Sequence, residues 1–281
     1  MTELQNTQNT QNTQDIKSYN LRTYKANTEQ HKVYMDMHKY QTYDYAKSQK
    51  RKYANLDNGT YTVEEVLNMM DEFIDPSDPD MDLPNSIHAY QTAERIHNLY
   101  NKTDDDEQFQ VCGLIHDLGK ILYKFGEPTW SVVGDTFPTG CEYSKTIIYY
   151  DDLQDNPDYN NPKYNTKYGV YKEKVGIQNL TMSYGHDEYL YQVLKSDKNR
   201  DKHFFASKYV DIIRFHSFYP WHTGNDYKYL MKESDNYVLE SVRHFNQFDL
   251  YSKKDNTKIT KRTKEYYSRL LKKYFPQKLS W

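Results

Sequence analysis

The segment VCGLIHDLGK, residues 111–120, places an imidazole and a carboxylate side by side inside an otherwise apolar, helix-forming run. His116 and Asp117 are both side-chain types that bind metal ions. An ordinary core histidine beside a solvated aspartate would be the better explanation of an isolated His-Asp dipeptide. The rest of the chain, however, supplies further histidines and aspartates in similar apolar settings, and these shift the balance toward a metal site.

Asp249 is the second local signal for such a site. It shares a helical stripe with Leu239, Val242 and Phe245, and a buried carboxylate without a partner is costly. Ion pairing or metal ligation would remove that cost. Three more histidines lie near the ends of predicted helices, and each of them alone is explicable as a core or surface residue: His88, His186 and His216.

Together these side chains supply four imidazoles and two carboxylates from five helical segments or their ends. Such a set can hold two six-coordinate metal ions that keep open positions, particularly if one carboxylate bridges them. Nitrogen and oxygen ligands with open positions suit non-haem iron and its oxygen chemistry. A single tetrahedral zinc is an alternative, although six ligands without cysteine exceed its needs. The candidate ligands are His88, His116, Asp117, His186, His216 and Asp249.

Amphipathic helices are expected to position these side chains, because apolar residues recur at three- and four-residue spacing. Thr62 and Glu65 form a capping box at the start of one helix, and Asn85 or Ser86 is expected to cap the next. The predicted helices span residues 62–73, 86–100, 107–125, 183–195, 204–218, 236–251 and 263–274. Residues 127–141 and 151–171 are expected to form long ordered loops, so the predicted fold class is an all-α helical bundle.

The predicted helix over residues 107–125 carries the central His-Asp pair. If it is continuous, Lys120 lies one turn beyond His116 and points the same way. Gly113 and Gly119 each cost about 1 kcal/mol of helix propensity relative to alanine. We therefore expect them where another backbone or a ligand comes close.

The composition narrows the class of protein. The chain has 37 basic and 40 acidic residues, and this net charge of −3 gives no sign of a nucleic-acid partner. Two cysteines without paired spacing argue against a disulfide framework or a cysteine-type zinc site. No apolar run reaches the roughly 20 residues of a membrane span, and the N-terminus lacks the apolar core of a signal peptide. We expect a soluble, cytoplasmic protein with no membrane partner.

The N-terminus differs from the rest of the chain. Residues 1–17 contain the repeat QNTQNTQNTQ, which is polar and has no apolar face. A segment of this composition cannot bury enough apolar surface to fold, so we expect a disordered tail. Residues 18–281 are predicted to form a single domain.

Two levels of resemblance then emerge. His88, the His116-Asp117 pair and Asp249 resemble the metal signature of the HD-domain superfamily, an all-helical group usually tied to phosphohydrolases, which makes an HD-domain-like bundle the expected fold. More specifically, residues 21–281 resemble the myo-inositol oxygenase family, because several long motifs occur in the right order. These motifs are DPSDPDMDLPNSIHAYQTAE, LIHDLGK, FGEPTWSVVGDTFPTGC, SYGHDEYLYQV, IIRFHSFYPWHTG, FNQFDLYSK and the terminal LSW.

The resemblance implies a monomeric, cytosolic enzyme with two iron ions in a mixed-valent Fe(II)/Fe(III) pair. It implies that O₂ cleaves the ring of myo-inositol to give D-glucuronate and water. The six candidate ligands would hold the irons, with Asp117 bridging them, and Asp117 and Lys120 would be catalytic. The implied substrate contacts are Arg22, Asp75, Pro76, Ser77, Lys120, Gly134, Asp135, His216, Ser217 and Lys253.

Pro76 departs from the family pattern. It follows Asp75 at a position where an acidic residue is expected, so only a backbone contact is expected there. Arg22 and the N-terminal segment are further expected to close over the site and keep reactive oxygen species from water.

Two other functions remain open at this point. An HD-type phosphohydrolase would use a metal-activated water on a phosphate ester. The two additional histidines, the near-neutral charge and the lack of a dense arginine cluster argue against it. A non-enzymatic di-iron binding or sensing module would bind iron and consume no oxygen in the presence of a polyol.

Overall fold

The computed structural model describes residues 25–77, 83–252 and 259–281. Over these ranges it is predominantly helical, with one short two-stranded sheet, which confirms the predicted all-α fold. The α-helices are α1 Glu29–Tyr40, α2 Tyr43–Lys52, α3 Val63–Met69, α4 Asn85–His97, α5 Asp104–Ile115, α6 His186–Lys195, α7 Ser207–Phe215, α8 Tyr219–His222, α9 Asp235–Ser252 and α10 Lys261–Tyr274. The 3₁₀ helices are η1 Met70–Glu72, η2 Leu118–Phe125, η3 Thr129–Ser131, η4 Tyr150–Asp155, η5 Ile177–Asn179 and η6 Lys228–Leu230.

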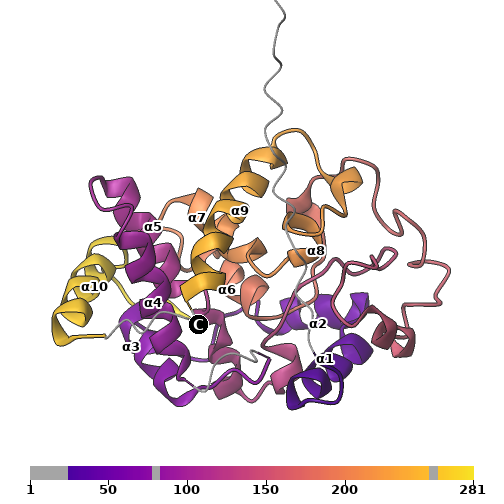
Figure 1. Cartoon of the computed structure of the whole chain (residues 1–281), viewed down its shortest axis with the longest axis horizontal. Coiled ribbons are helices and arrows are strands. Elements are labelled where there is room, and N and C mark those ends of the chain that lie inside the picture. Colours follow the sequence, from indigo (N-terminus) through magenta and orange to yellow (C-terminus); the bar gives the residue numbers. More distant parts are fainter. Residues whose placement is uncertain (1–24, 78–82, 253–258) are drawn as a thin grey trace, which may run out of the picture.

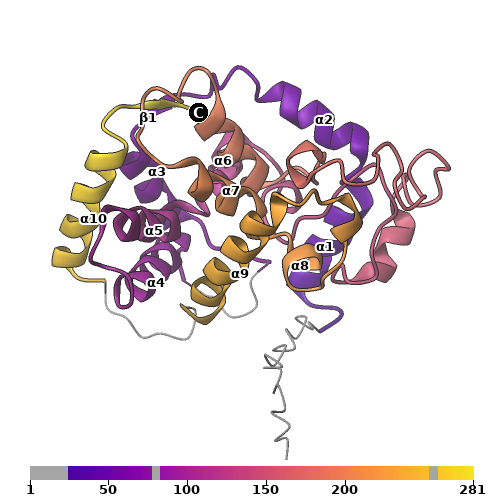
Figure 2. The same cartoon turned by 90° about the horizontal axis from the view of Figure 1, so that it is seen from above.

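The helices pack around a shared core (Figure 1). α4 packs along α5, α6 along α7, and α9 contacts both α4 and α7. α10 covers α5 on one side of the molecule, whereas α1 and α2 lie on the opposite side, as the two perpendicular views agree (Figure 2). Fully buried apolar side chains from four of these helices meet in one cluster: Ala93, Leu114, Ile213 and Val242.

The two strands bring the C-terminus back to the helices. β1, Thr60–Tyr61, pairs antiparallel with β2, Leu279–Ser280, so that Thr60 faces Ser280. The terminal Trp281 is fully buried in the main core. This pairing ties the C-terminal end of the chain to the start of α3.

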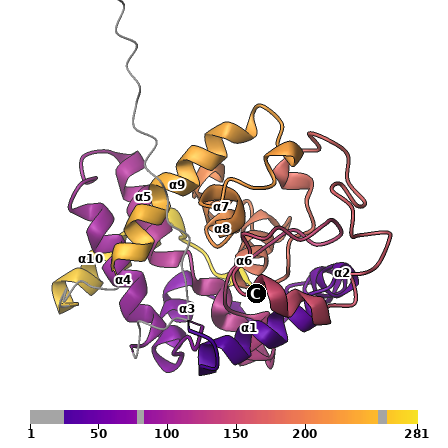
Figure 3. The same ribbon diagram turned by 45° about the vertical axis from the view of Figure 1, so that its right-hand side comes forward.

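The long segment between η2 and α6 has little regular helix, yet it is well packed. It runs beside α1 (Figure 3), which contacts both η3 and η4. Gln41 exchanges two hydrogen bonds with the backbone of Tyr184, and Asn156 donates to the carbonyls of His38 and Gln41. These side-chain bonds hold the segment in place, as expected for long ordered loops.

The prediction of one continuous helix over residues 107–125 is wrong. α5 ends at Ile115, His116 follows in helical conformation, and the chain tightens into the 3₁₀ helix η2 after Asp117. A 3₁₀ helix has three residues per turn, so Lys120 comes over Asp117 and not over His116. The backbone N–H of Lys120 also donates to the Asp117 carbonyl, at 2.9 Å.

The two glycines of this segment behave as expected. A Cβ on Gly119 would overlap the backbone carbonyl of His186, and a Cβ on Gly113 would lie 2.8 Å from the Ile96 side chain. Gly119 therefore lets η2 lie against the start of α6, and Gly113 lets α5 lie against α4. Both close approaches bring segments that carry candidate ligands together.

Two helix starts show where capping was predicted correctly and where it was not. Thr62 and Glu65 form the predicted capping box of α3. α4, by contrast, begins after Pro84 without a side-chain cap, so the expected cap by Asn85 or Ser86 is wrong. The amide of Asn85 turns instead toward Asp117 and Lys120. Of the helices in the described ranges, none combines the length and apolar character needed to cross a membrane.

Candidate metal centre

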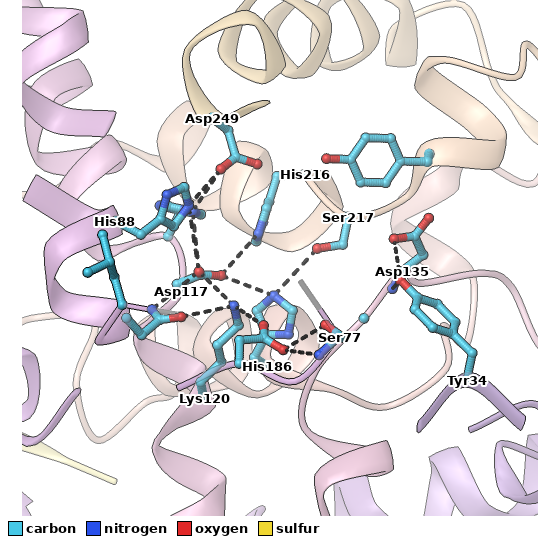
Figure 4. Close-up of a pocket in the computed structure, with 16 residues that line it drawn as sticks. Tyr34, Ser77, His88, Asp117, Lys120, Asp135, His186, His216, Ser217 and Asp249 are labelled. Atoms are coloured by element: carbon cyan, nitrogen blue, oxygen red, sulfur yellow. Dashed lines mark hydrogen bonds and ion pairs between the residues drawn. The ribbon is translucent and has the colours of Figure 1, made fainter. Parts of the chain in front are cut away.

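Asp117 lies at the centre of a buried cluster of histidines (Figure 4). Its Oδ2 atom is 4.0 Å from His88 Nε2 and 3.6 Å from His116 Nε2. Its Oδ1 atom is 3.3 Å from His186 Nε2 and 3.6 Å from His216 Nε2. One carboxylate therefore presents each of its oxygens to a different pair of imidazoles.

Asp249 joins the first of these groups. Its Oδ1 atom is 2.9 Å from His88 Nε2 and 3.4 Å from His116 Nε2. We call the group of His88, His116, Asp249 and Asp117 Oδ2 site A, and the group of His186, His216 and Asp117 Oδ1 site B. All six side chains are buried, with at most 6% of any residue exposed.

The histidine rings are held with one nitrogen toward the cluster. Nδ1 of His116, His186 and His216 lies 2.8 Å from the backbone carbonyls of Gly113, Val132 and Ile213, respectively. A carbonyl can only accept, so each Nδ1 carries a proton. This tautomer leaves Nε2 to bind a metal, and such backbone partners are typical of metal-ligating histidines.

The two groups fit a pair of metal ions. In each, three candidate donor atoms from different residues lie within 4.8 Å of one another, with Asp117 common to both. The donors are imidazole nitrogens and carboxylate oxygens without thiolate, a set that suits non-haem iron. Site A offers four protein donors and site B three, so site B leaves more positions for other ligands.

Lys120 supplies the main positive side chain of the centre. Its ammonium lies 2.7 Å from Asp117 Oδ2, 2.7 Å from Asp75 Oδ2 and 3.1 Å from Asn85 Oδ1. Burial opposes the charge of Lys120, but the two carboxylates raise its pKa, so it remains an ammonium. Burial would likewise raise the pKa of Asp117, but Lys120 and the histidines hold it well below its usual value.

A cavity opens beside these groups, and most of the predicted substrate-binding residues line it. Of those in the described ranges, Pro76 is the one that does not line the cavity. Arg22 and Lys253 lie outside the described residues. The predicted residues along the cavity are Asp75, Ser77, Lys120, Gly134, Asp135, His216 and Ser217.

The Asp75–Ser77 turn is internally fixed. Asp75 Oδ1 accepts hydrogen bonds from the backbone N–H and the hydroxyl of Ser77, at 2.8 and 2.7 Å. The Ser77 carbonyl in turn accepts from Gln30 of α1, at 2.7 Å. With Asp75 Oδ2 bound to Lys120, this turn connects α1 to the metal centre.

The far wall of the cavity is formed by α1 and the Gly134-Asp135 turn. Tyr34 donates its hydroxyl to Asp135 Oδ1 at 3.0 Å (Figure 4). Gly134 has φ +90°, and Met37 occupies the space that a Cβ there would need. Tyr34 could not be singled out from the sequence, because nothing in its neighbourhood distinguishes it from the chain's other tyrosines.

Two further polar residues at the centre were also missed. Asn85 bridges Lys120 and Asp117, donating to Asp117 Oδ2 at 3.3 Å. Asp187 is 1% exposed, and its Oδ1 atom lies 2.6 Å from His186 Nε2. The His186-Asp187 dipeptide repeats the pattern of His116-Asp117, so the sequence contained a signal for Asp187. Burial opposes ionisation of Asp187, but His186 and His216 lower its pKa.

Four other histidines of the central and C-terminal chain lie outside this cluster. His222 is fully buried and binds the backbone carbonyl of His216 at 2.9 Å, which supports the end of α7. His244 stacks on Phe109, and the other two contact Gln110 and the Leu194 carbonyl: His97 and His203. These contacts agree with packing roles.

Comparison with known proteins gives a consistent result. A family model described as "Myo-inositol oxygenase" matches residues 27–281. The chain is 45% identical over 250 residues to a protein of Rattus norvegicus named "Inositol oxygenase", which covers 89% of this chain and 85% of that relative. A protein of the same name from Dictyostelium discoideum is 45% identical over 256 residues, with coverage of 89% and 85%. "Probable inositol oxygenase" of Oryza sativa subsp. japonica is 42% identical over 267 residues, covering 92% and 84%.

Proposed function

Because the chain belongs to the myo-inositol oxygenase family, we propose that it opens the ring of myo-inositol with O₂ at two iron ions, giving D-glucuronate and water. The enzyme is an oxygenase that acts on inositol. The single observation that best supports a two-metal centre is the carboxylate of Asp117, with a pair of histidines facing each of its oxygens.

In this proposal the residues of site A would hold one iron and those of site B the other, with Asp117 contributing to both. The pair is expected in the mixed-valent Fe(II)/Fe(III) state. Bound iron would supply a Lewis acid for substrate hydroxyls and the redox capacity to use O₂. The residues around the centre hold the ligands in place: backbone carbonyls fix three imidazoles, and Lys120 with Asn85 fixes the shared carboxylate.

We propose that myo-inositol binds on the side of site B. That site has three protein donors against four at site A, so it retains more open positions. Ser217 follows the site B ligand His216 directly and lines the cavity with Lys120 and Asp135. A neutral polyol needs both donors and acceptors to fix one ring face, and a lysine ammonium with aspartate and serine oxygens supplies both.

The surroundings also restrict water. Tyr34 and Met37 of α1 cover the Gly134-Asp135 turn, and Gln30 holds the Asp75–Ser77 turn. Excluding water strengthens the electrostatic contacts inside a site and limits side reactions of activated oxygen. We propose that Arg22 and Lys253, outside the described residues, complete the substrate contacts.

The remaining expectations are also proposals. We propose, as the family resemblance implies, a monomer in which residues 18–281 act as a single domain. We further propose that the enzyme works in the cytoplasm. Size-exclusion chromatography with light scattering would test the monomer, and a mass of twice the chain would contradict it.

The phosphohydrolase alternative is not favoured. The curated relatives cited above carry inositol oxygenase names, and no arginine is among the described residues that line the cavity. A phosphate ester would require the paired N–H donors of an arginine guanidinium or a comparable cluster of cations. The non-enzymatic sensing module is not favoured either, because the family consists of enzymes.

Oxygen uptake by the iron-loaded protein tests the proposed reaction. After brief mild reduction, the protein receives myo-inositol, and glucuronate is assayed in the same vessel. We expect about one O₂ consumed per glucuronate formed, because the proposed ring opening takes all four electrons from the substrate. Iron-bound, folded protein that consumes no O₂ with myo-inositol would contradict the proposal, and phosphate release from a phosphoester panel would revive the alternative.

A further inference from the structure

Asp187 joins the start of α6 to the end of α7 through one serine. Its Oδ2 atom accepts the backbone N–H of Ser217 at 3.2 Å, and its Oδ1 atom accepts the Ser217 hydroxyl at 3.1 Å. Both residues are buried, but only Ser217 is among the residues that line the cavity. A ligand in the cavity can therefore contact Ser217, whereas Asp187 contacts Ser217 from the side away from the cavity.

These two bonds determine which way the Ser217 hydroxyl is polarised. The Ser217 hydroxyl donates to the Oδ1 atom of Asp187, so its proton points to Asp187. The Ser217 hydroxyl also lies 3.4 Å from His186 Nε2. A metal in site B would bind to this nitrogen, which would then not be free to accept a hydrogen bond. With its proton committed, the serine oxygen offers its lone pairs to the cavity.

We propose that Asp187 is a positioning residue that makes Ser217 a hydrogen-bond acceptor, so that the site selects a substrate hydroxyl donating to Ser217. The inference rests on the proposed binding of myo-inositol beside Ser217. Ser217 thus requires a donor on the substrate, which a polyol hydroxyl supplies and a keto oxygen does not.

The Asp187→Asn variant reverses this polarity with almost no change in shape. The backbone N–H of Ser217 can only donate, so the amide oxygen of the new side chain must face it. The amide N–H₂ then faces the Ser217 hydroxyl and donates to it. The proton of the Ser217 hydroxyl then points into the cavity. There it faces the proton of the substrate hydroxyl that donated to Ser217 in the unchanged protein.

The test is a double-mutant cycle on substrate affinity, measured by calorimetric titration of iron-loaded protein with myo-inositol in the absence of O₂. The variants are Asp187→Asn, Ser217→Ala and the two combined. Each single variant is expected to weaken binding about threefold to tenfold, the usual range for one neutral hydrogen bond. The combined variant is expected to bind no more weakly than Ser217→Ala, because Asp187 acts through that hydroxyl.

Glu188→Gln is the matched control. Glu188 is the next residue of α6, is buried, and pairs with Arg214 at 2.7 Å without lining the cavity. Its substitution is expected to lower stability and leave the affinity for myo-inositol unchanged. Asp187 Oδ1 also lies 2.6 Å from His186 Nε2, the metal-facing nitrogen of site B. Iron content is therefore measured for every variant and affinities are compared at equal iron content, which separates substrate positioning from loss of the metal centre.

The outcomes distinguish this inference from the function on which it rests. Unchanged affinity in Ser217→Ala would refute the substrate contact itself. Weaker binding in Ser217→Ala combined with unchanged binding in Asp187→Asn, or with fully additive losses in the double variant, would overturn the role of Asp187. A panel of cyclitols with one hydroxyl replaced by a keto group adds a second reading. Asp187→Asn is expected to reduce the preference for hydroxyl over keto at one ring position, and an unchanged preference at every position would also overturn the proposal.

Discussion

The ammonium of Lys120 lies 2.7 Å from Oδ2 of Asp117, three residues earlier in the chain. The chain changes from α-helix to 3₁₀ helix after Asp117, and the three residues per turn of that helix align Lys120 with Asp117. The same ammonium contacts Asp75, so one buried cation is shared by the central carboxylate and the cavity wall.

Replacing Lys120 with methionine should destabilise the metal-free protein strongly. Asp75 and Asp117 would be left as buried charges without their cation, and removing one partner of a buried ion pair typically costs about 3–5 kcal/mol. Chemical denaturation would measure the loss. The control is Lys124→Met, since Lys124 pairs with the largely exposed Glu72 and its loss should cost far less. Equal losses in the two variants would show that the buried pair contributes nothing special.

Removing Asp249 should affect the two metal sites unequally. It belongs to site A alone, whereas Asp117 belongs to both. We expect iron content to fall from about two to about one per chain in Asp249→Ala and toward none in Asp117→Ala. Metal analysis of the purified variants would measure it, with His97→Gln as a control outside the centre. Loss of a single iron in Asp117→Ala would argue against a shared carboxylate.

Gly119→Ala should disturb site B through the backbone of His186. Its new Cβ would overlap the backbone carbonyl of His186, which no side-chain rotation can relieve. Overpacking of this kind typically costs about 1–3 kcal/mol, and here it would displace a ligand-bearing helix start. The unfolding temperature and the iron content would both fall. Gly185→Ala is the control, because its nearest neighbour would be at an ordinary 3.6 Å. A Gly119→Ala protein with normal iron content and stability would contradict the close approach.

Asp158→Asn should make the protein more stable at neutral pH. Burial raises the pKa of Asp158 above 3.8, so its ionised form is disfavoured in the folded state. The contribution of this group to stability therefore falls as pH rises from the unfolded pKa through the raised folded pKa. The asparagine oxygen can still accept from the Tyr43 N–H, now at 2.7 Å, without a buried charge. Unfolding free energy measured against pH would show the two proteins converging in acid.

A lower unfolding free energy of Asp158→Asn at neutral pH would contradict this prediction. It would mean that the charge-assisted bond to Tyr43 at the start of α2 outweighs the cost of burying the carboxylate. Asp158→Ala provides the reference for losing that bond altogether.

The candidate ligands could be predicted from the sequence because each one is a polar side chain on or beside an apolar helical stripe. His116, Asp117 and Asp249 stand out in this way, since burying them requires partners whatever the fold. Most of the helices were predictable from spacing, although α1 and α2 were not among those predicted, and the all-α class followed. The family resemblance named the substrate contacts, and the functions of Arg22 and Lys253 remain predictions.

Only the tertiary structure decided how these side chains face one another. The division of Asp117 between two histidine pairs depends on helices distant in sequence, as do the contacts of Asn85 and Tyr34. The break after Asp117 was hidden as well, because an α-helix and a 3₁₀ helix have similar local preferences. Packing of Gly119 against His186 brings η2 onto α6, an approach that no local pattern encodes. Spacing along a chain reveals which residues share a face, whereas the pairing of faces follows from how side-chain volumes fit across the core.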